Sequence, residues 1–244
     1  MDSAQTIRDA VSRVSVLRSA SQSEPGLRRA VTAVKRFQAQ RFAYTYEVEL
    51  RTEPFQNAAR FFLEELYSDK DYALRDAQFS RIAGALQSVF PKQVVHTAVS
   101  LAQLHALTEE LDHAMGFGWL QLESSMQDDD KTLYAEVWRN VGRRVERELQ
   151  LSSVLKVGQE LAHLTRTPGL RMMLKMMRRP AQAAGLSVLQ QFLESGFDTF
   201  AKMSRERDEV TDFLSMIRTR ESKLIDLLFS GKKNALSNER AFPV

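Results

Sequence analysis

The sequence predicts an all-α protein, a single bundle of about nine or ten helices. Glycine and proline are scarce, with 10 and 6 residues in a chain of 244. A sheet protein of this size needs many tight turns, so few turn-forming residues favour long helices. Only residues 42–50 alternate like a strand, and no second strand is present to pair with them. We expect one domain over residues 1–230 and a polar tail over 231–244.

The first half of the chain divides at prolines and polar turns. Apolar residues at helical spacing from Ile7 to Leu17 predict a first helix, and SQSEPG at 21–26 ends it. Pro25 begins a second helix that we extend to about Arg51. A third helix is expected over about 55–67 after Pro54. Asp71 is the expected N-cap of a fourth helix, which reaches Phe90 before Pro91.

The second half follows the same logic. A helix over about 92–115 is expected to end at GFG (116–118), and DDDK (128–131) forms a turn. The next helix contains Leu133 to Val145 and either continues or kinks near residues 149–152. Thr167–Pro168–Gly169 is a break, followed by a short Met-rich helix (170–179). After Pro180, two further helices complete the bundle.

Composition limits the classes of function. With 43% hydrophobic and 27% charged residues, the chain is typical of a soluble globular protein. The absence of cysteine excludes disulfides, thiolate metal sites and cysteine nucleophiles, and fits a reducing cytoplasm. No signal-like or charge-free membrane segment is present, and the net charge of +3 is too small to indicate nucleic acid. No catalytic motif of a hydrolase, P-loop or dinucleotide-binding protein occurs, which disfavours an enzyme.

Two E-x-x-H pairs raise a metal hypothesis. Ferritin-like dimetal proteins use two such pairs and two further glutamates. The matching residues here are Glu110 and His113, Glu160 and His163, with Glu64 and Glu136 in the remaining positions. Helical phase places most of these side chains away from the apolar stripes of their helices. We therefore favour solvent-exposed faces, keep the metal site as an alternative, and predict no cofactor.

Asp112 is the more informative polar residue. It lies on the same side of its helix as apolar residues. His105 precedes it by seven residues and lies on nearly the same side of the helix. A carboxylate that faces a core must find a partner or bind a proton. Candidate partners are His105, Arg75 and Arg81. With Asp76, these residues form either a closed structural ion pair or the polar part of a ligand pocket.

The segment RTPGLRMMLKMMRRPA (166–181) combines cations with methionines and contains no acid. A Met-rich, basic, amphipathic helix can form an adaptable binding surface or contact an anionic membrane surface. Alternatively, the methionines fill the core and the cations are solvated. Aromatic residues are absent, which argues against single-stranded nucleic acid. The residues expected to bind a partner are Arg171, Met172, Lys175, Met176, Arg178 and Arg179.

Four segments carry a family resemblance: FFLEELYSDKDYALRDAQF, LTEELDHAM, MMRRPAQAAGLSVLQQFLESGFDTF and FLSMIRTRE. Over about residues 30–230, the chain resembles a largely proteobacterial family of all-helical proteins that is described as a domain of unknown function. The resemblance implies one helical domain in a bacterial cytoplasm and transfers no activity, cofactor or catalytic residue. The matching positions are Phe61, Phe62, Leu66, Tyr67, Asp71, Arg75, Asp76, Leu111, Asp112, Arg179, Pro180, Gly185, Phe192, Gly196, Phe197, Arg220 and Glu221.

Three functions remain open at this point. The first is a non-enzymatic protein that binds another macromolecule through the basic Met-rich face. The second is a small-molecule or metal-binding protein, including a haem protein, with its site between the helices that carry Arg75 and Asp112. The third is a structural subunit that forms a homodimer through an exposed apolar helix face.

Overall fold

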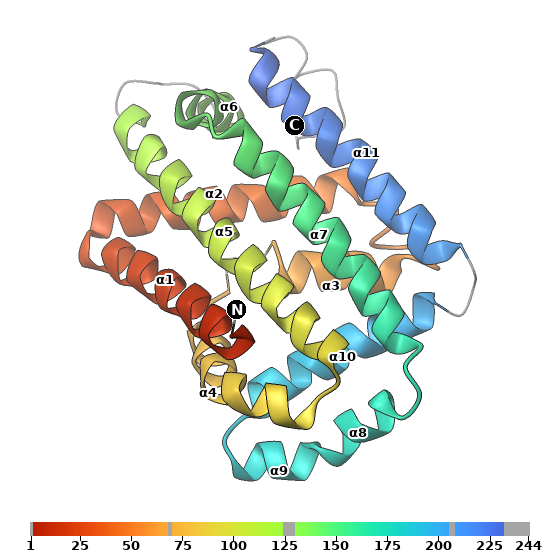
Figure 1. The fold of residues 1–244 in the computed structure, drawn as a ribbon. Helices are drawn as coiled ribbons and strands as arrows, with labels where there is room; N and C mark the ends of the chain where they lie inside the picture. Colours follow the sequence, from red (N-terminus) through yellow and green to blue (C-terminus); the bar gives the residue numbers. More distant parts are fainter. Residues whose placement is uncertain (1, 68–69, 124–129, 205–207, 232–244) are drawn as a thin grey trace.

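The computed structural model describes residues 2–67, 70–123, 130–204 and 208–231. These residues form helices and no strand, which confirms the all-α prediction (Figure 1). The helices are α1 (Ser3–Ser23), α2 (Pro25–Thr45), α3 (Gln56–Glu65), α4 (Ala73–Val89), α5 (Lys92–Leu122), α6 (Asp130–Val141), α7 (Arg144–Thr165), α8 (Leu170–Met176), α9 (Arg178–Ala183), α10 (Ser187–Met203) and α11 (Glu209–Ser230). None of those described is long and apolar enough to cross a membrane.

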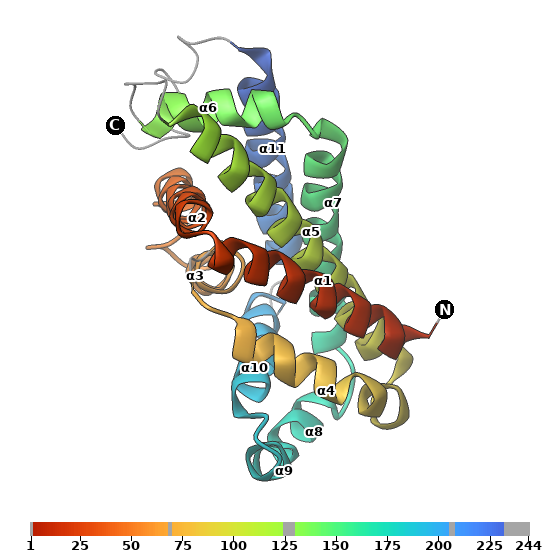
Figure 2. The same ribbon diagram turned by 90° about the vertical axis from the view of Figure 1, so that its left-hand side faces the viewer.

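Helix α5 is the axis of the molecule. It contacts α1, α2, α6 and α7, and α7 in turn packs against α10 and α11. Figures 1 and 2 show α5 running through the middle, with α8 and α9 together at one end of the molecule. The sequence of α5 explains its position, because its buried residues are spread around the helix instead of along one stripe. A helix with this pattern must be covered by neighbours on several sides.

The largest apolar core lies between α2, α3, α7, α10 and α11. Aromatic rings dominate it: Phe62 packs edge-on against Phe213 at 5.3 Å, and Phe42 stacks on Tyr67 at 4.6 Å. A second cluster, around Trp119, Tyr134 and Trp138, joins α2, α5, α6 and α11. Phe61 and Phe62, from the segment FFLEELYSDKDYALRDAQF, therefore form part of this core.

Helix α2 ends at Thr45, so the predicted extension to Arg51 is wrong. A run of turns follows, in which Tyr46 is fully buried and Glu49 is nearly so. Arg220 from α11 explains the early end. It donates to the Thr45 carbonyl at 3.0 Å and forms a two-point ion pair with Glu49. These long-range contacts outweigh the local helical pattern.

Helix α5 continues through the GFG segment to Leu122, which contradicts the predicted end at residue 115. Gly116 lies against α2, and a Cβ there would lie only 3.0 Å from the Val31 Cα atom. Gly118 similarly faces Val137 and Val141 of α6. These glycines allow close helix packing and do not end the helix.

The break between α6 and α7 lies at Gly142 and Arg143, which both have positive φ angles. Helix α7 is then continuous from Arg144 to Thr165, so residues 149–152 do not interrupt it. Helix α4 has Tyr72 at its N-cap, one residue after the predicted Asp71, although the Asp71 side chain accepts a hydrogen bond from the Ala73 amide at 2.8 Å. Residues 128–129 of the expected DDDK turn and residues 232–244 of the tail lie outside the described residues.

Candidate functional site

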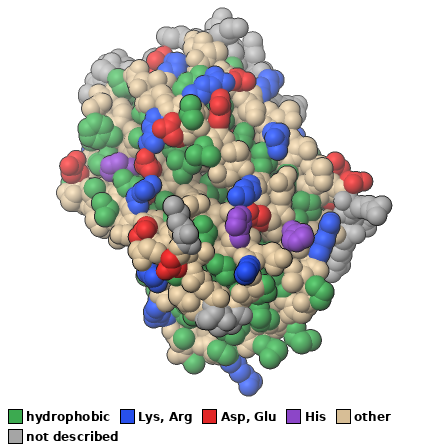
Figure 3. Space-filling view, in the orientation of Figure 1, with side chains coloured by type: hydrophobic (Ala, Val, Ile, Leu, Met, Phe, Trp, Pro, Cys, Tyr) green, Lys and Arg blue, Asp and Glu red, His purple; other side chains and the backbone are tan. Residues whose placement is uncertain are grey.

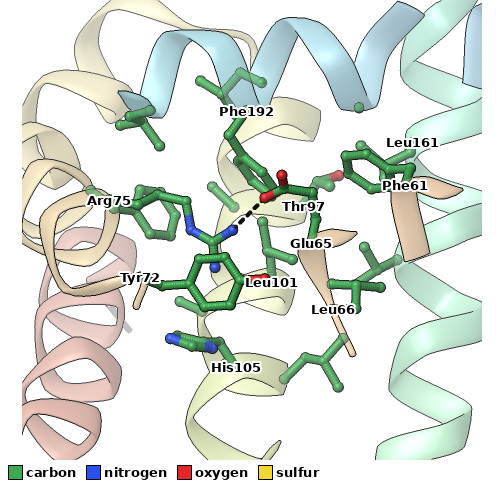
Figure 4. A pocket seen from close by; sticks show the side chains of 18 of the residues that line it. Phe61, Glu65, Leu66, Tyr72, Arg75, Thr97, Leu101, His105, Leu161 and Phe192 are labelled. Carbon is green, nitrogen blue, oxygen red and sulfur yellow. Dashed lines mark hydrogen bonds and ion pairs between the residues drawn. The ribbon is translucent and has the colours of Figure 1, made fainter. Parts of the chain in front are cut away.

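A cavity of about 160 Å³ lies among α3, α4, α5, α7 and α10. All four residues predicted as pocket or buried polar groups line it: Arg75, Asp76, His105 and Asp112. Most of the remaining wall is aliphatic or aromatic (Figure 4). The labelled side chains in that view include Phe61, Leu66, Leu101, Leu161 and Phe192. The cavity is therefore largely apolar and contains a few fixed polar groups, which is typical of ligand sites.

Arg75 is paired with Glu65, and not with Asp112 as the sequence suggested. The distance from Arg75 Nη1 to Glu65 Oε2 is 3.0 Å. The guanidinium lies 3.9 Å from the centre of the Tyr72 ring and 4.5 Å from that of Phe192. Figure 4 shows Arg75 between these two rings and directed toward Glu65. Cation–π contacts on two rings hold the guanidinium in place.

The corner between α3 and α4 positions the Arg75–Glu65 pair. The Tyr72 hydroxyl donates to the Glu64 carbonyl at 2.7 Å, which joins the start of α4 to the end of α3. Glu65 and Arg75 are consequently brought together across ten residues of sequence. Arg81 is directed elsewhere and donates to the Gly185 carbonyl at 3.1 Å, so it is not a partner of Asp112.

Asp76 belongs to a buried polar network that connects α1, α4 and α5. Its Oδ2 atom lies 2.7 Å from Arg18 Nη1 and 2.9 Å from His105 Nε2. Burial alone would raise the pKa of Asp76, but hydrogen bonding with His105 and the charges of His105 and Arg18 lower it below its ordinary value. The carboxylate is therefore ionised and fully compensated.

Glu109 continues this network toward α2. Lys35 Nζ lies 2.7 Å from Glu109 Oε1, and Arg18 Nη2 lies 3.3 Å from the same oxygen. Burial raises the pKa of Glu109, but the charge and hydrogen bond of Lys35 and the charge of Arg18 reverse the shift and lower it. Arg18 and Lys35 thus pair with Asp76 and Glu109, and all of these except Arg18 line the cavity.

Asp112 is buried on the same helix as Glu109, but its carboxylate has fewer partners. It is 3% exposed and accepts one hydrogen bond, from Gln38 at 3.1 Å. Within the described part of the chain, no cation lies at ion-pair distance from it. Burial raises the pKa of Asp112 above its ordinary value, although Lys35 and Arg147 oppose the shift. The protonated form is therefore favoured relative to an exposed aspartate.

Arg147 is the nearby buried cation. It lies 4.1 Å from the centre of the Trp138 ring, and its Nη1 atom donates to Gln150 at 3.3 Å. Its Nη2 atom is buried without a hydrogen-bond partner among the described residues. Burial lowers the pKa of Arg147. Sequence reasoning did not identify this residue as buried.

The six residues of the metal alternative are not brought together. Within the described ranges, no three histidine or acidic side chains are grouped as a metal site would require. His113 is 3.0 Å from the Ser21 hydroxyl instead. Each of the four carboxylates lies beside a different basic side chain: Glu64 beside Lys70, Glu110 beside Arg143, Glu136 beside Arg139, and Glu160 beside His96. His163 is exposed. Among the described residues, the ferritin-like ligand set is therefore not assembled at a single site.

The basic Met-rich segment lies at the surface, in α8 and α9. Met172 and Met176 are 68% and 71% exposed, whereas Met173 packs against a small core. Two of the predicted arginines are paired with α10: Arg171 with Asp198 at 3.0 Å and Arg178 with Glu194 at 2.8 Å. Lys175 and Arg179 are exposed, and neither has a carboxylate at ion-pair distance within the described residues. The lower edge of Figure 3 shows apolar side chains beside cations where Figure 1 places these helices.

Several site residues were not identified from the sequence. Arg18 and Lys35 each follow a valine of an apolar stripe by four residues, so helical spacing contained a signal for their burial. Glu65 and Tyr72 lie in the segment FFLEELYSDKDYALRDAQF, and Phe192 is one of the family-matching positions, but their contacts with Arg75 depend on how α3, α4 and α10 meet.

Comparison with known proteins gives a family and no described activity. A family model for a domain of unknown function (DUF8198) matches residues 17–235. No curated protein and no solved structure matches the chain. The family match covers most of the chain, including every residue of the cavity wall except Val11. The chain therefore belongs to the DUF8198 family.

Proposed function

We propose that this protein is a non-enzymatic binding protein that holds an apolar small molecule in the cavity between α3, α4, α5, α7 and α10. The single observation that carries this proposal is the cavity of about 160 Å³ with its mainly apolar wall. An engineered apolar cavity of roughly 150 Å³ in another protein stays dry and binds benzene or xenon. The space is therefore sufficient for a ligand of that size.

The apolar part of the wall supports ligand binding over a simple packing defect. Leu101 of α5 and Leu161 of α7 line the same space as Phe61 and Phe192, so four helices contribute to it. Several polar groups of the wall are held in pairs: Glu65 with Arg75, Asp76 with His105, and Asp112 with Gln38. A few fixed polar groups in an apolar wall can orient a ligand. The lack of cysteine and the family resemblance support a bacterial cytoplasmic location, which we include in the proposal.

Filling the cavity tests the proposal. The variant Leu101→Phe/Leu161→Phe places added volume in the space, and Leu133→Phe adds the same group to a packed part of the core, where Leu133 is 4% exposed. Overpacking of a filled core costs about 1–3 kcal/mol, whereas added volume in a true cavity costs less. The free energy of unfolding is measured by urea denaturation.

Ligand binding is measured with benzene by NMR and by thermal stabilisation. A ligand at about 100 times its Kd stabilises the folded state by roughly 2.7 kcal/mol. We expect benzene to stabilise the wild type and Leu133→Phe, but not the double variant. Equal benzene binding by the double variant, or no binding by the wild type, would refute the proposed function.

A second candidate is the docking of a protein partner on the α8–α9 surface. The observation that favours it is the exposure of Met172 and Met176 beside Lys175 and Arg179. Exposed methionines adapt to different apolar side chains, and unpaired cations attract acidic groups. The expected partner is a protein with an acidic segment that also carries apolar side chains.

Site-specific photo-crosslinking tests this surface. A crosslinker is placed at position 176 and, as a control, at Val145, which is 74% exposed on α7. We expect a defined adduct at 176 that is lost in Lys175→Glu/Arg179→Glu, with no change in thermal stability. The same adducts at both positions, or retention after charge reversal, would count against the candidate.

A further inference from the structure

Apart from Asp112, the acidic side chains of the cavity wall have cationic partners. Glu65 neutralises Arg75, while Arg18 and Lys35 are bound to Asp76 and Glu109. A charged ligand group placed beside these pairs would have no counter-ion of its own. Burial of an uncompensated charge is costly, so the arrangement favours an uncharged ligand.

Arg75 nevertheless has unused hydrogen-bond donors. A guanidinium carries five N–H groups in a planar fork. Arg75 donates through Nη1 to Glu65, and its Nε atom is 3.9 Å from Asp76, which is beyond hydrogen-bond distance. Among the residues that the structure describes, no second acceptor is bonded to Arg75. The remaining donors belong to a side chain that lines the cavity and is only 11% exposed.

The two rings around Arg75 make these donors suitable for recognition. Tyr72 and Phe192 contact the guanidinium at 3.9 and 4.5 Å, so its orientation is fixed before a ligand enters. Leu101 and the Phe192 ring, both labelled in Figure 4, provide apolar wall nearby. A preorganised donor costs less entropy when it binds than a free side chain does.

We propose that the ligand is an uncharged, mainly apolar molecule with one oxygen acceptor, such as a ketone or ester carbonyl, and that this oxygen accepts a hydrogen bond from Arg75. The inference rests on the proposed function and adds the chemical class of the ligand. The donors are the Arg75 N–H groups that Glu65 does not occupy. The apolar body of the ligand occupies the space bounded by Leu101 and Leu161.

Three aromatic probes of similar size test the inference. Ethylbenzene has no acceptor, acetophenone has a neutral carbonyl, and benzoate carries a negative charge. Their dissociation constants are measured by NMR titration of the wild type and of Arg75→Met/Glu65→Gln, which removes both charges of the pair. The control Arg51→Met/Glu47→Gln removes an exposed pair, in which Arg51 and Glu47 are 74% and 52% exposed.

We expect the Arg75→Met/Glu65→Gln variant to bind acetophenone about tenfold more weakly or worse, since a hydrogen bond to a charged group is worth roughly 1.5–3 kcal/mol. Ethylbenzene affinity should change less than about twofold, because its contacts are apolar. The control variant should bind every probe as the wild type does. Arg75→Lys keeps the charge beside Glu65 but lacks the donor fork, so it should also lose the preference for acetophenone.

Two results would overturn the inference while leaving the proposed function intact. One is an equal loss of acetophenone and ethylbenzene binding in both Arg75 variants. The other is tighter binding of benzoate than of acetophenone by the wild type. If no probe binds the wild type, the proposed function fails and the inference fails with it.

Discussion

Removal of Glu221 is expected to destabilise the protein strongly, because this carboxylate joins α11 to α2 inside the core. Arg41 Nη1 lies 2.6 Å from Glu221 Oε1, and the Tyr46 hydroxyl donates to the same oxygen at 2.9 Å. Arg41 and Glu221 are each 6% exposed, and Tyr46 is fully buried. Burial lowers the pKa of Arg41, but Glu221 more than offsets this and raises it. The guanidinium therefore stays charged and depends on its partner.

The structure sets the magnitude of the effect. Glu221→Ala leaves a buried cation and a buried hydroxyl without an acceptor, and loss of one partner of a buried ion pair costs about 3–5 kcal/mol. For a chain of 150–250 residues, each kcal/mol shifts Tm by roughly 2–4 °C, so a fall in Tm of about 6–20 °C is expected. Urea denaturation followed by circular dichroism measures the free energy, and Glu47→Ala is the exposed control.

A triple variant tests whether the loss of stability in Glu221→Ala comes from leaving Arg41 and Tyr46 buried without an acceptor. Arg41→Met/Tyr46→Phe/Glu221→Leu removes all three polar groups and fills the site with apolar atoms of similar size. Apolar replacement of a buried ion pair is often neutral or stabilising, so this variant should recover most of the stability. If Glu221→Ala costs less than about 1 kcal/mol, the pair is not the buried contact described here. The reasoning would also be refuted if the triple variant lost as much free energy of unfolding as the sum of its three single substitutions.

The remaining predictions concern helix packing and buried carboxylates. Gly116→Ala should lower the free energy of unfolding by about 1–3 kcal/mol because its Cβ would press against α2, whereas Gly84→Ala on the exposed side of α4 should raise it by roughly 0.5–1 kcal/mol. Asp112→Asn should stabilise the protein at neutral pH, and the gain should shrink toward pH values of about 4. Asp76→Asn should destabilise the protein at neutral pH, and this loss of stability should disappear below a pH of about 4. Urea denaturation at a series of pH values measures both effects.

The signs of the two pH effects follow from opposite pKa shifts. Folding raises the pKa of Asp112, so its contribution to stability is present below the unfolded pKa and is lost as the pH rises through the folded pKa. Folding lowers the pKa of Asp76, so its contribution is present above the unfolded pKa and is lost as the pH falls. Parallel pH profiles for the two variants would contradict these assignments. Equal stability changes for both glycine variants would contradict the packing argument.

The candidate site was predicted in part. The position of Asp112 on an apolar helix face correctly indicated burial, and Arg75, Asp76 and His105 line the same cavity. Their pairing was not predictable from spacing, since Arg75 bonds Glu65 across the α3–α4 corner and Asp112 bonds Gln38 of α2. Helical periodicity predicts the direction in which a side chain projects from its own helix. It does not give the distance to a side chain on another helix.

The glycines of α5 show the same division. A GFG segment predicts a helix end when only local propensity is considered, because glycine disfavours the helix interior. In the structure Gly116 lies where α2 approaches most closely, and packing outweighs the propensity cost. Conversely, the break at Gly142 and Arg143 has positive φ angles in a region that the sequence describes as one amphipathic run.

The sequence alone determined the all-α class, most helix positions and the burial of several polar residues. Periodicity, capping residues and scarce turn-formers are local properties, and local properties specify local structure. Only the tertiary structure decided that Arg75 pairs with Glu65, that the residues of the two E-x-x-H pairs are not grouped among the described residues, and that a cavity remains between the helices. These features depend on how side chains from distant helices fill shared space, and packing of that kind is a property of the assembled fold.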